Sequence, residues 1–234
     1  MKYSNKTWRA CALCMLAALA MTTGCQNKPA ETADSTNAAT DSVVAESPLD
    51  NAVVRAIMDR RSVRKYKPEP VPKEMLDVIL HCGINAPNAM NEQRWEVRVT
   101  ESKAFIDGVT KVFIESAKSD ERVQKMVGDP DFRNMFRNAP TVIFVAGKAD
   151  EKSSPIDCGL LGENIMLAAQ SMGLGTCCLG SAAGFLNSNP GAANYLKQLA
   201  FSDGYELLYA IAIGYPDESP EAKPRDASKI RYIE

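Results

Sequence analysis

The sequence has only one histidine, and this scarcity excludes several kinds of catalytic site. His81 is the sole imidazole among 234 residues, so a Ser-His-Asp or Cys-His nucleophile would depend on it. It falls inside a predicted helix beside Leu80 and Cys82, where we interpret it as an ordinary helix-face residue. No Cys-x-x-Cys pair accompanies it, so the sequence offers no zinc site.

Two common nucleotide-binding motifs are also missing. No Gly-x-Gly-x-x-Gly follows a predicted strand, and no Gly-x4-Gly-Lys-Ser/Thr occurs. The glycine-rich stretch GLGTCCLG at 173–180 has the wrong spacing for both motifs. A Rossmann fingerprint and a P-loop are therefore excluded.

The chain lacks an apolar run near its N-terminus that is long enough to span a bilayer, which needs about 20 residues. Three basic residues precede a short apolar run at 11–21, which suits a signal-peptide core. The following TTGC resembles a bacterial lipobox, so we predict a lipoprotein signal peptide at 1–24 and a lipidated Cys25. The alternative is a conventional signal peptide cleaved near Gly24. The lipoprotein interpretation predicts an exported protein on the periplasmic or surface side, attached to a bacterial membrane by lipid only.

Residues 25–48 begin with Cys25, the predicted lipidation site. The stretch that follows it is rich in Ala, Thr, Ser, Asp and Glu and contains no aromatic residues. Such a stretch buries too little apolar surface to order itself, so we predict a flexible tether and a folded domain at 49–234. Of 27 Lys and Arg, three lie in residues 1–24, against 29 Asp and Glu in the whole chain. This acidic balance gives no indication of a nucleic-acid partner.

Four cysteines remain in the predicted domain: Cys82, Cys158, Cys177 and Cys178. We expect buried free thiols, because the adjacent pair at 177–178 lies in an apolar run and is poorly placed to join loops. That pair leaves two interpretations open, a redox pair or two small thiols that fill a tight strand.

Hydrophobic periodicity predicts an α+β domain. Helices are expected at about 49–60, 72–83, 102–117, 157–172 and 189–199, with a polar, partly helical stretch up to about 137. The first helix is expected to use Ser47 as its N-cap and Pro48 as its first residue. Strands are expected at 95–100, 141–146, 176–179 and 207–213. These elements do not alternate strictly, so we predict a mixed sheet flanked by helices.

The strongest chemical signal is RRSVRKY at 60–66, just past the end of the first predicted helix. The guanidinium groups of Arg60, Arg61 and Arg64 and the hydroxyl of Ser62 are suited to gripping a phosphate group. The alternative is a solvated basic helix end that interacts favourably with the helix dipole.

Four segments in order resemble the nitroreductase family. RRSVRKY is similar to its R-R-S-x-R-x-F, and APNAMNEQRW at 86–95 is similar to its A-P-S-x-x-N-x-Q-P-W. NIMLAA at 164–169 leads into the loop that ends at Leu179-Gly180, and IGYP at 213–216 precedes Lys223-Pro224-Arg225. The resemblance covers about 52–226. Asn88 stands where the family has Ser, and Arg94 stands where it has Pro.

The resemblance implies how FMN is bound. Arg60, Arg61 and Ser62, with Lys223 and Arg225, would bind its phosphate and ribityl. Arg64 would lie near the N1/O2 edge, Leu179-Gly180 would form the flavin-facing loop, and the Gly180 N–H would point at N5. Asn88 and Asn91 would come from the partner subunit, because this family builds its FMN sites at a homodimer interface.

The function implied is that of an FMN-dependent NAD(P)H oxidoreductase. Electrons would pass from reduced nicotinamide or another donor through FMN to a small-molecule acceptor such as a nitroaromatic or quinone, with no catalytic side chain. Two alternatives stay open: an exported flavin-binding carrier or sensor without turnover, and a specialised flavin-fragmenting or dehalogenating relative.

Overall fold

The computed structural model describes residues 48–233. The predicted signal peptide, Cys25 and all of the predicted tether except Pro48 lie outside these residues. No helix in the described part is both long and apolar enough to cross a membrane.

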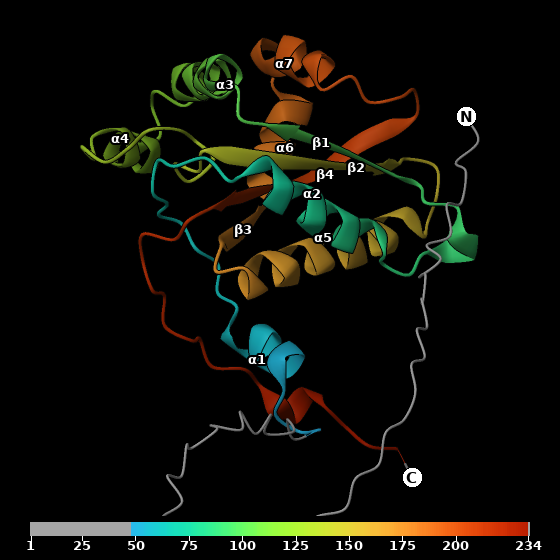
Figure 1. The fold of residues 1–234 in the computed structure, drawn as a ribbon. Helices are drawn as coiled ribbons and strands as arrows, with labels where there is room; N and C mark the ends of the chain where they lie inside the picture. The colour runs from blue at the N-terminus through green and yellow to red at the C-terminus, as the bar shows by residue number, and fades with distance from the viewer. Residues whose placement is uncertain (1–47, 234) are drawn as a thin grey trace, which may run out of the picture. The chain divides into compact units, whose positions relative to one another are not determined.

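A four-stranded sheet with the order β1-β2-β4-β3 forms the centre of the fold (Figure 1). Its strands are β1 (Trp95–Thr100), β2 (Thr141–Lys148), β3 (Gly175–Leu179) and β4 (Tyr205–Gly214). All three strand pairs are antiparallel. The α+β prediction is confirmed, and each predicted strand is present within one or two residues of its expected bounds. Among residues 48–233, parallel pairing occurs at one isolated bridge, between Ser62 and Thr176.

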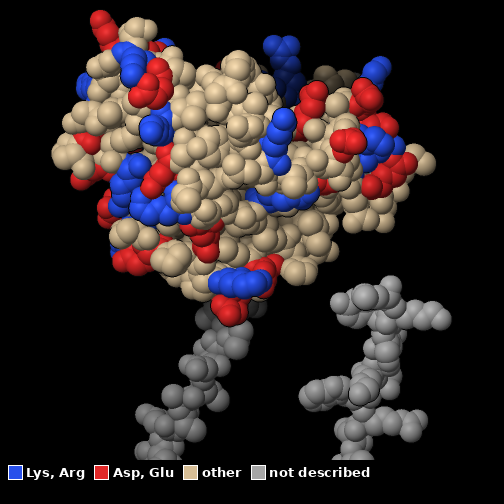
Figure 2. Space-filling model, turned by 90° about the horizontal axis from the view of Figure 1, so that it is seen from above, with Lys and Arg blue, Asp and Glu red and all other residues tan. Residues whose placement is uncertain are grey.

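The two faces of the sheet are covered by different helices, because alternate residues of a strand point to opposite faces. Val142 and Phe144 pack with α3 (Lys103–Ser116), α6 (Gly180–Ser188) and α7 (Ala193–Gln198). Ile143 and Val145 pack with α2 (Lys73–Ile84) and α5 (Ser154–Ser171). Figure 1 shows α2 and α5 on one side of the sheet and α3, α6 and α7 on the other. On the side of α3 and α7, acidic and basic side chains lie intermixed mainly toward two margins of the face, around a broad uncharged area (Figure 2).

Helix α1 (Ala52–Asp59) begins later than predicted. The predicted N-cap Ser47 lies outside the described residues, and the prediction that Pro48 is the first helical residue is wrong, because Pro48 lies in a turn. Asn51 is the N-cap, and its Oδ1 accepts hydrogen bonds from the N–H groups of Val53 and Val54. An Asn side chain at this position satisfies N–H groups that the first helical turn leaves unpaired.

Helix α6 was not predicted at all. It contains Gly180 and Gly184, and glycine disfavours a helix interior. The other short elements are α4 (Glu121–Val127) in the predicted partly helical stretch, and the 3-10 turns η1 (Ala89–Asn91), η2 (Pro190–Ala192) and η3 (Ala227–Lys229). Together η2 and α7 replace the single helix predicted at 189–199.

The free edge of β3 is joined to the segment after α1, which in turn pairs with the segment after β4. The N–H of Val63 donates to the carbonyl of Thr176 at 2.9 Å, and Val63 lies where a side chain on Gly175 would need space. The N–H of Lys67 donates to Tyr215, and the N–H of Asp217 donates to Lys65, each at 2.9 Å. The chain around residues 62–67 is therefore fastened both to the sheet and to the segment that follows β4.

Candidate functional site

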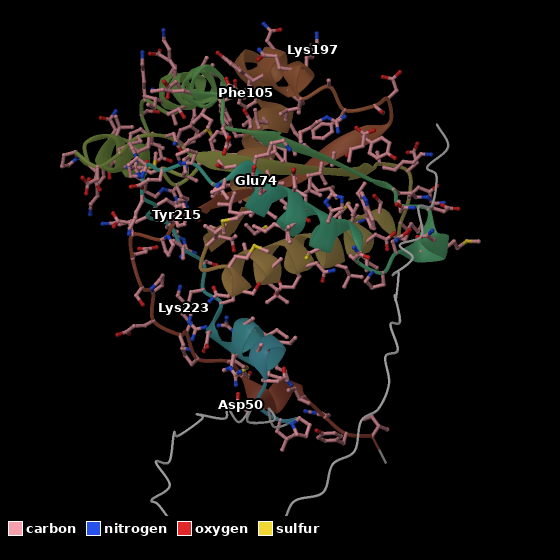
Figure 3. All side chains as sticks on the ribbon, viewed as in Figure 1. Asp50, Glu74, Phe105, Lys197, Tyr215 and Lys223 are labelled. Atoms are coloured by element: carbon pink, nitrogen blue, oxygen red, sulfur yellow. The ribbon has the colours of Figure 1, made fainter. Side chains whose placement is uncertain are left out.

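A cavity of about 110 Å³ lies where the segment after α1 meets the C-terminal segment. Five cations and one carboxylate line it. The cations are Arg60, Arg61, Arg64, Lys223 and Arg225, the carboxylate is that of Glu221, and Ser62 and Pro220 complete the lining. Lys223 is seen close to the chain that leaves α1 (Figure 3). The structure thus brings together the two basic clusters that the sequence places far apart.

The cations of this cavity outnumber the carboxylates near them. Arg60 forms a long ion pair with Glu163 of α5, with 4.0 Å between Nε and Oε1, and Glu221 is the one carboxylate of the lining. Arg64 donates through Nη1 to the carbonyl of Ser62 at 2.9 Å, and Arg225 donates in the same way to Lys223 at 3.2 Å. Neutral carbonyls hold these guanidinium groups in place and leave their charge available, so the cavity fits a phosphate group.

The Arg61 side chain also binds backbone carbonyls at the end of α1. Its Nη1 donates to the carbonyls of Met58 and Arg60, at 2.6 and 2.9 Å. These carbonyls lie at the end of α1, where a cation interacts favourably with the helix dipole. For Arg61, the phosphate-binding and helix-end interpretations of the sequence are therefore compatible.

Leu179 and Gly180 lie where β3 ends and α6 begins. The Leu179 side chain is buried in the core, so only its backbone is available to a ligand. Gly180 is exposed, and no atom lies within 4 Å of the place where a Cβ would be. The N-cap of α6 has no side-chain hydrogen bond, which leaves room for a ligand beside the first turn of this helix.

Asn88 and Asn91 do not line the cationic cavity of their own chain. Asn88 Oδ1 accepts a hydrogen bond from the N–H of Gln93 at 2.9 Å, and Asn88 Nδ2 donates to Ala86 at 3.3 Å. Asn91 is exposed and has a left-handed backbone with φ of 56°. In a single chain these two residues and the cations are therefore separate groups.

The four described cysteines are free thiols, and Cys177 and Cys178 differ in environment. Cys177 is buried in the core, and this burial raises the pKa of its thiol, while Arg64 and Arg137 oppose the shift. Cys178 is exposed, because neighbouring strand residues point to opposite faces. The expectation of buried thiols holds for Cys158 and Cys177, but it is wrong for Cys178.

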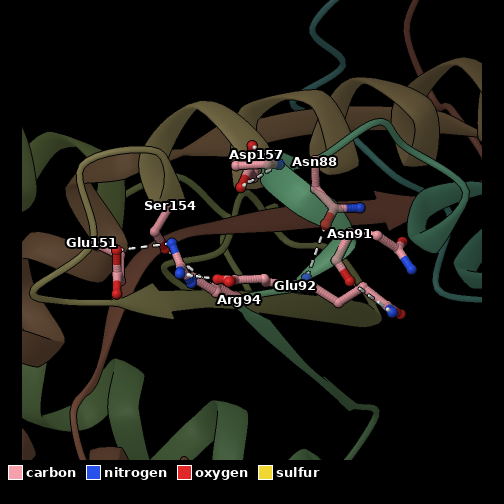
Figure 4. A network of polar contacts seen from close by, with 9 residues as sticks. Asn88, Asn91, Glu92, Arg94, Glu151, Ser154 and Asp157 are labelled. Atoms are coloured by element: carbon pink, nitrogen blue, oxygen red, sulfur yellow. Dashed lines mark hydrogen bonds and ion pairs between the residues drawn. The ribbon is translucent and has the colours of Figure 1, made fainter.

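Three polar residues near these segments were missed from the sequence, and a fourth was only noted. Arg133 and Arg137 line a hollow of about 400 Å³ that also contains Arg64. Asp157, together with Arg94, which the sequence singled out only as a departure from the family motif, fastens the loop that carries Asn88 and Asn91 (Figure 4). The detectable signal for Asp157 was an acid in the first turn of α5.

The comparisons with known proteins agree with this geometry. Residues 57–215 match the Nitroreductase family. The NADPH-flavin oxidoreductase of Vibrio harveyi is 30% identical over 185 residues, which cover 75% of this chain and 70% of that protein. FMN-bound nitroreductases from Desulfitobacterium hafniense and Bacteroides fragilis align with TM-scores of 0.71 and 0.69, at 26% and 25% identity, over 79% of this chain and 100% of theirs. The expected fold is confirmed, and the chain belongs to the nitroreductase family.

Proposed function

We propose that this protein is an FMN-dependent NAD(P)H oxidoreductase that reduces a small-molecule acceptor such as a nitroaromatic or a quinone. The observation that carries the proposal is the cavity with five cations, formed by two segments from opposite ends of the fold. A relative from Bacillus subtilis, 26% identical over 188 residues, is an FMN reductase that uses NAD(P)H. When bound, FMN supplies the redox chemistry by taking electrons from the donor and passing them to the acceptor.

The protein's own residues bind and orient the cofactor in this proposal. Arg60, Lys223 and Arg225 supply charge-assisted hydrogen bonds to the phosphate, and Ser62 adds a hydroxyl donor. Arg64 lines both the cationic cavity and the larger neighbouring hollow. From this position Arg64 would reach the N1/O2 edge of the flavin, where a cation stabilises the reduced, anionic form.

Anaerobic titration of the purified protein tests this function. We expect a yellow protein whose visible absorbance is bleached by NADH or NADPH and returns when a quinone or nitroaromatic is added. A yellow protein that neither nicotinamide reduces would instead be a flavin carrier or sensor. A protein that binds no FMN would contradict the proposal.

A homodimer is the second part of the proposal, because large apolar side chains are exposed in the single chain. On α1, Val53 is 66% and Met58 68% exposed; on α5, Ile156 is 66% and Leu160 41% exposed. Contiguous apolar surface of this kind marks interaction sites. A second copy of the chain that covers these helices would also bring Asn88 and Asn91 to its partner's FMN.

Lipid attachment at Cys25 is the third part, and it rests on the TTGC segment that follows the short apolar run. Mass spectrometry of the mature N-terminus tests it directly. We expect an acylated Cys25 and several acyl chains, since one chain holds a protein at a membrane only marginally. The Cys25→Ala variant should remain unprocessed or become soluble. An unmodified cysteine would contradict the lipid anchor without affecting the FMN proposal.

A further inference from the structure

The loop at residues 88–94 is fastened at both of its ends to the chain around the start of α5 (Figure 4). At one end, the backbone N–H of Ala89 donates to both carboxylate oxygens of Asp157, each at 3.3 Å. At the other end, Ser154 Oγ donates to the carbonyl of Arg94 at 3.1 Å. The loop therefore has a fixed position relative to α5, and we call these contacts the loop clasp.

The side chain of Arg94 strengthens the second end of the clasp. Its Nη1 lies 2.8 Å from Glu151 Oε2, and its Nη2 forms an ion pair with Glu92. The Arg94 side chain is only 22% exposed, so these charge-assisted bonds are partly shielded from water. Proline, which the family motif has here, would form neither bond.

The backbone of this loop needs such a restraint. Met90, Asn91 and Gln93 have φ angles of 54°, 56° and 50°. L-residues enter this left-handed region only at an energetic cost, which is smallest for Asn. A loop with several such residues persists when surrounding contacts hold it in place.

Asp157 is an acid at a buried position. The residue is 5% exposed, and a buried carboxylate is costly unless it is hydrogen-bonded. Within the described residues, both of its carboxylate oxygens accept hydrogen bonds from the N–H of Ala89. Its position in the first turn of α5 favours a negative charge, because the helix dipole is positive there. The Asp157 carboxylate therefore binds the loop that carries Asn88 and Asn91.

We propose that Asp157 is a positioning residue for the flavin site: with Arg94 it holds Asn88 and Asn91 in the conformation that reaches FMN in the partner subunit. This inference rests on the proposed function, because it requires these two asparagines to contact FMN. Asp157 itself touches no cofactor. Its effect on FMN passes entirely through the loop.

FMN titration of stripped, full-length protein tests the inference, with Cys158→Ala as the matched control. Cys158 is the buried neighbour of Asp157 on the same helix turn. Its thiol contacts the carbonyl of Ala146 and Ser154 rather than Ala89, so Cys158→Ala leaves the Asp157–Ala89 bonds in place. We expect Asp157→Ala to weaken FMN binding about tenfold, comparable to the loss of one hydrogen bond to a charged group. Asp157→Asn keeps an acceptor oxygen and should restore most of the affinity. Cys158→Ala should bind FMN with unchanged affinity, even though it removes buried atoms.

Two further measurements separate positioning from general stability. Amide hydrogen exchange at residues 88–94 should speed up in flavin-free Asp157→Ala and stay unchanged in Cys158→Ala. Adding Asp157→Ala to the double variant Asn88→Ala/Asn91→Ala should weaken FMN binding no further, because both contacts that Asp157 positions are then already absent. If Asp157→Ala does not fold, Arg94→Gln tests the opposite end of the clasp. We then expect faster amide hydrogen exchange at residues 88–94 and a smaller loss of FMN affinity.

The outcomes distinguish this inference from the function on which it rests. If Asn91→Ala binds FMN with normal affinity, the shared site of the proposed function is wrong. If Asn91→Ala weakens binding while Asp157→Ala behaves like Cys158→Ala, the positioning role is wrong and the shared site stands. A further loss of affinity when Asp157→Ala is added to Asn88→Ala/Asn91→Ala would also overturn the positioning role.

Discussion

Single residues at the cationic cavity bring charge from two distant parts of the chain to one place. Arg60 follows α1, whereas Arg225 lies in the segment after β4, and both line the same cavity. Arg60 forms one long ion pair with Glu163, and Arg225 donates to the carbonyl of Lys223. The two residues therefore act on one phosphate and should be similarly sensitive to substitution.

Replacing either Arg60 or Arg225 with Ala should weaken FMN binding by roughly ten- to a hundredfold. This corresponds to about 1.5–3 kcal/mol for one charge-assisted contact. The measurement is the flavin content after purification and the dissociation constant from fluorescence titration. Lys111→Ala is the control, because Lys111 is an exposed cation on α3, on the other side of the sheet. If both Arg variants fold and purify with full flavin content, the phosphate assignment is wrong.

Buried titratable groups predict how stability changes with pH. Burial raises the pKa of the Cys158 thiol to about 11 from the usual 9, and Asp157 contributes to the shift against a hydrogen bond with Ser154. Burial also raises the pKa values of Tyr66 and Tyr209. Below pH 9 the Cys158 thiol is neutral in both the folded and the unfolded chain. In that range it therefore contributes no pH dependence to the free energy of unfolding. Above pH 9 the unfolded chain loses this proton first, so the free energy of unfolding falls.

The Cys158 contribution to this loss should lie between pH 9 and 11 and amount to about 2 kcal/mol at most. Denaturant unfolding from pH 7 to 11 measures it, and Cys158→Ala should show a shallower decline than the wild type. Tyr66 and Tyr209 should still cause part of the fall in the free energy of unfolding in both proteins. Parallel pH profiles for Cys158→Ala and the wild type would show that the thiol does not titrate as described.

At the scale of elements, strongly periodic segments were predictable from the sequence and loop-dependent features were not. β1 and β2 were predicted because WEVRVT and TVIFVA have clear strand patterns. α5 was predicted with a late start, and its end was correct because Gly173, with φ of 76°, stops the helix. α6 was missed because its two glycines and many small residues resemble a loop.

The same division applies to the candidate site. The basic cluster at 60–64 and the pair at 223 and 225 were recognisable as sequence motifs, and the structure brings them together. The contact between Asp157 and Ala89 was not predictable, because it joins a helix to a loop through left-handed backbone that no sequence pattern specifies. Arg137 was missed for the same reason, since its φ of 61° places it in an irregular loop.

Helix α5 provides a test of the proposed dimer. Ile156 and Leu160 are one turn apart on its exposed face, so a partner would bury both. Leu160→Lys should convert the dimer to a monomer and reduce flavin retention, because a buried unpaired charge is costly. Sedimentation velocity with absorbance at a flavin wavelength measures both effects. The control is Val99→Lys on the edge strand β1, where Val99 is also exposed. A flavin-loaded dimer of Leu160→Lys would place the interface elsewhere.

At the scale of the whole molecule, the proposal makes each FMN site a product of two chains. One chain would supply Arg60 to Arg64 and the other would supply Asn88 and Asn91. An obligate dimer of this kind should bury well over about 2,000 Å². Flavin retention would then depend on protein concentration, because dissociation would break every site.

Mixing Arg60→Ala with Asn91→Ala subunits tests this arrangement. Each variant alone should be deficient at both sites of its homodimer. After unfolding and reassembly together, a mixed dimer should contain one doubly altered site and one intact site. Flavin binding and activity should therefore return in part, measured on heterodimers isolated with two different affinity tags. Proven heterodimers without recovery would exclude a shared site.

The pairing of the chain around residues 62–67 with the segment after β4 has a consequence for the order in which parts of the protein fold. All four strands are complete when synthesis reaches Gly214. The N–H of Asp217, and the cations Lys223 and Arg225, come only afterwards and must close a loop back to residues 60–65. Contacts between such distant segments carry a large loop-closure cost and form slowly. A nascent chain that stops at Gly214 would contain the whole sheet but only half of the phosphate cavity, so capture of FMN should follow chain completion.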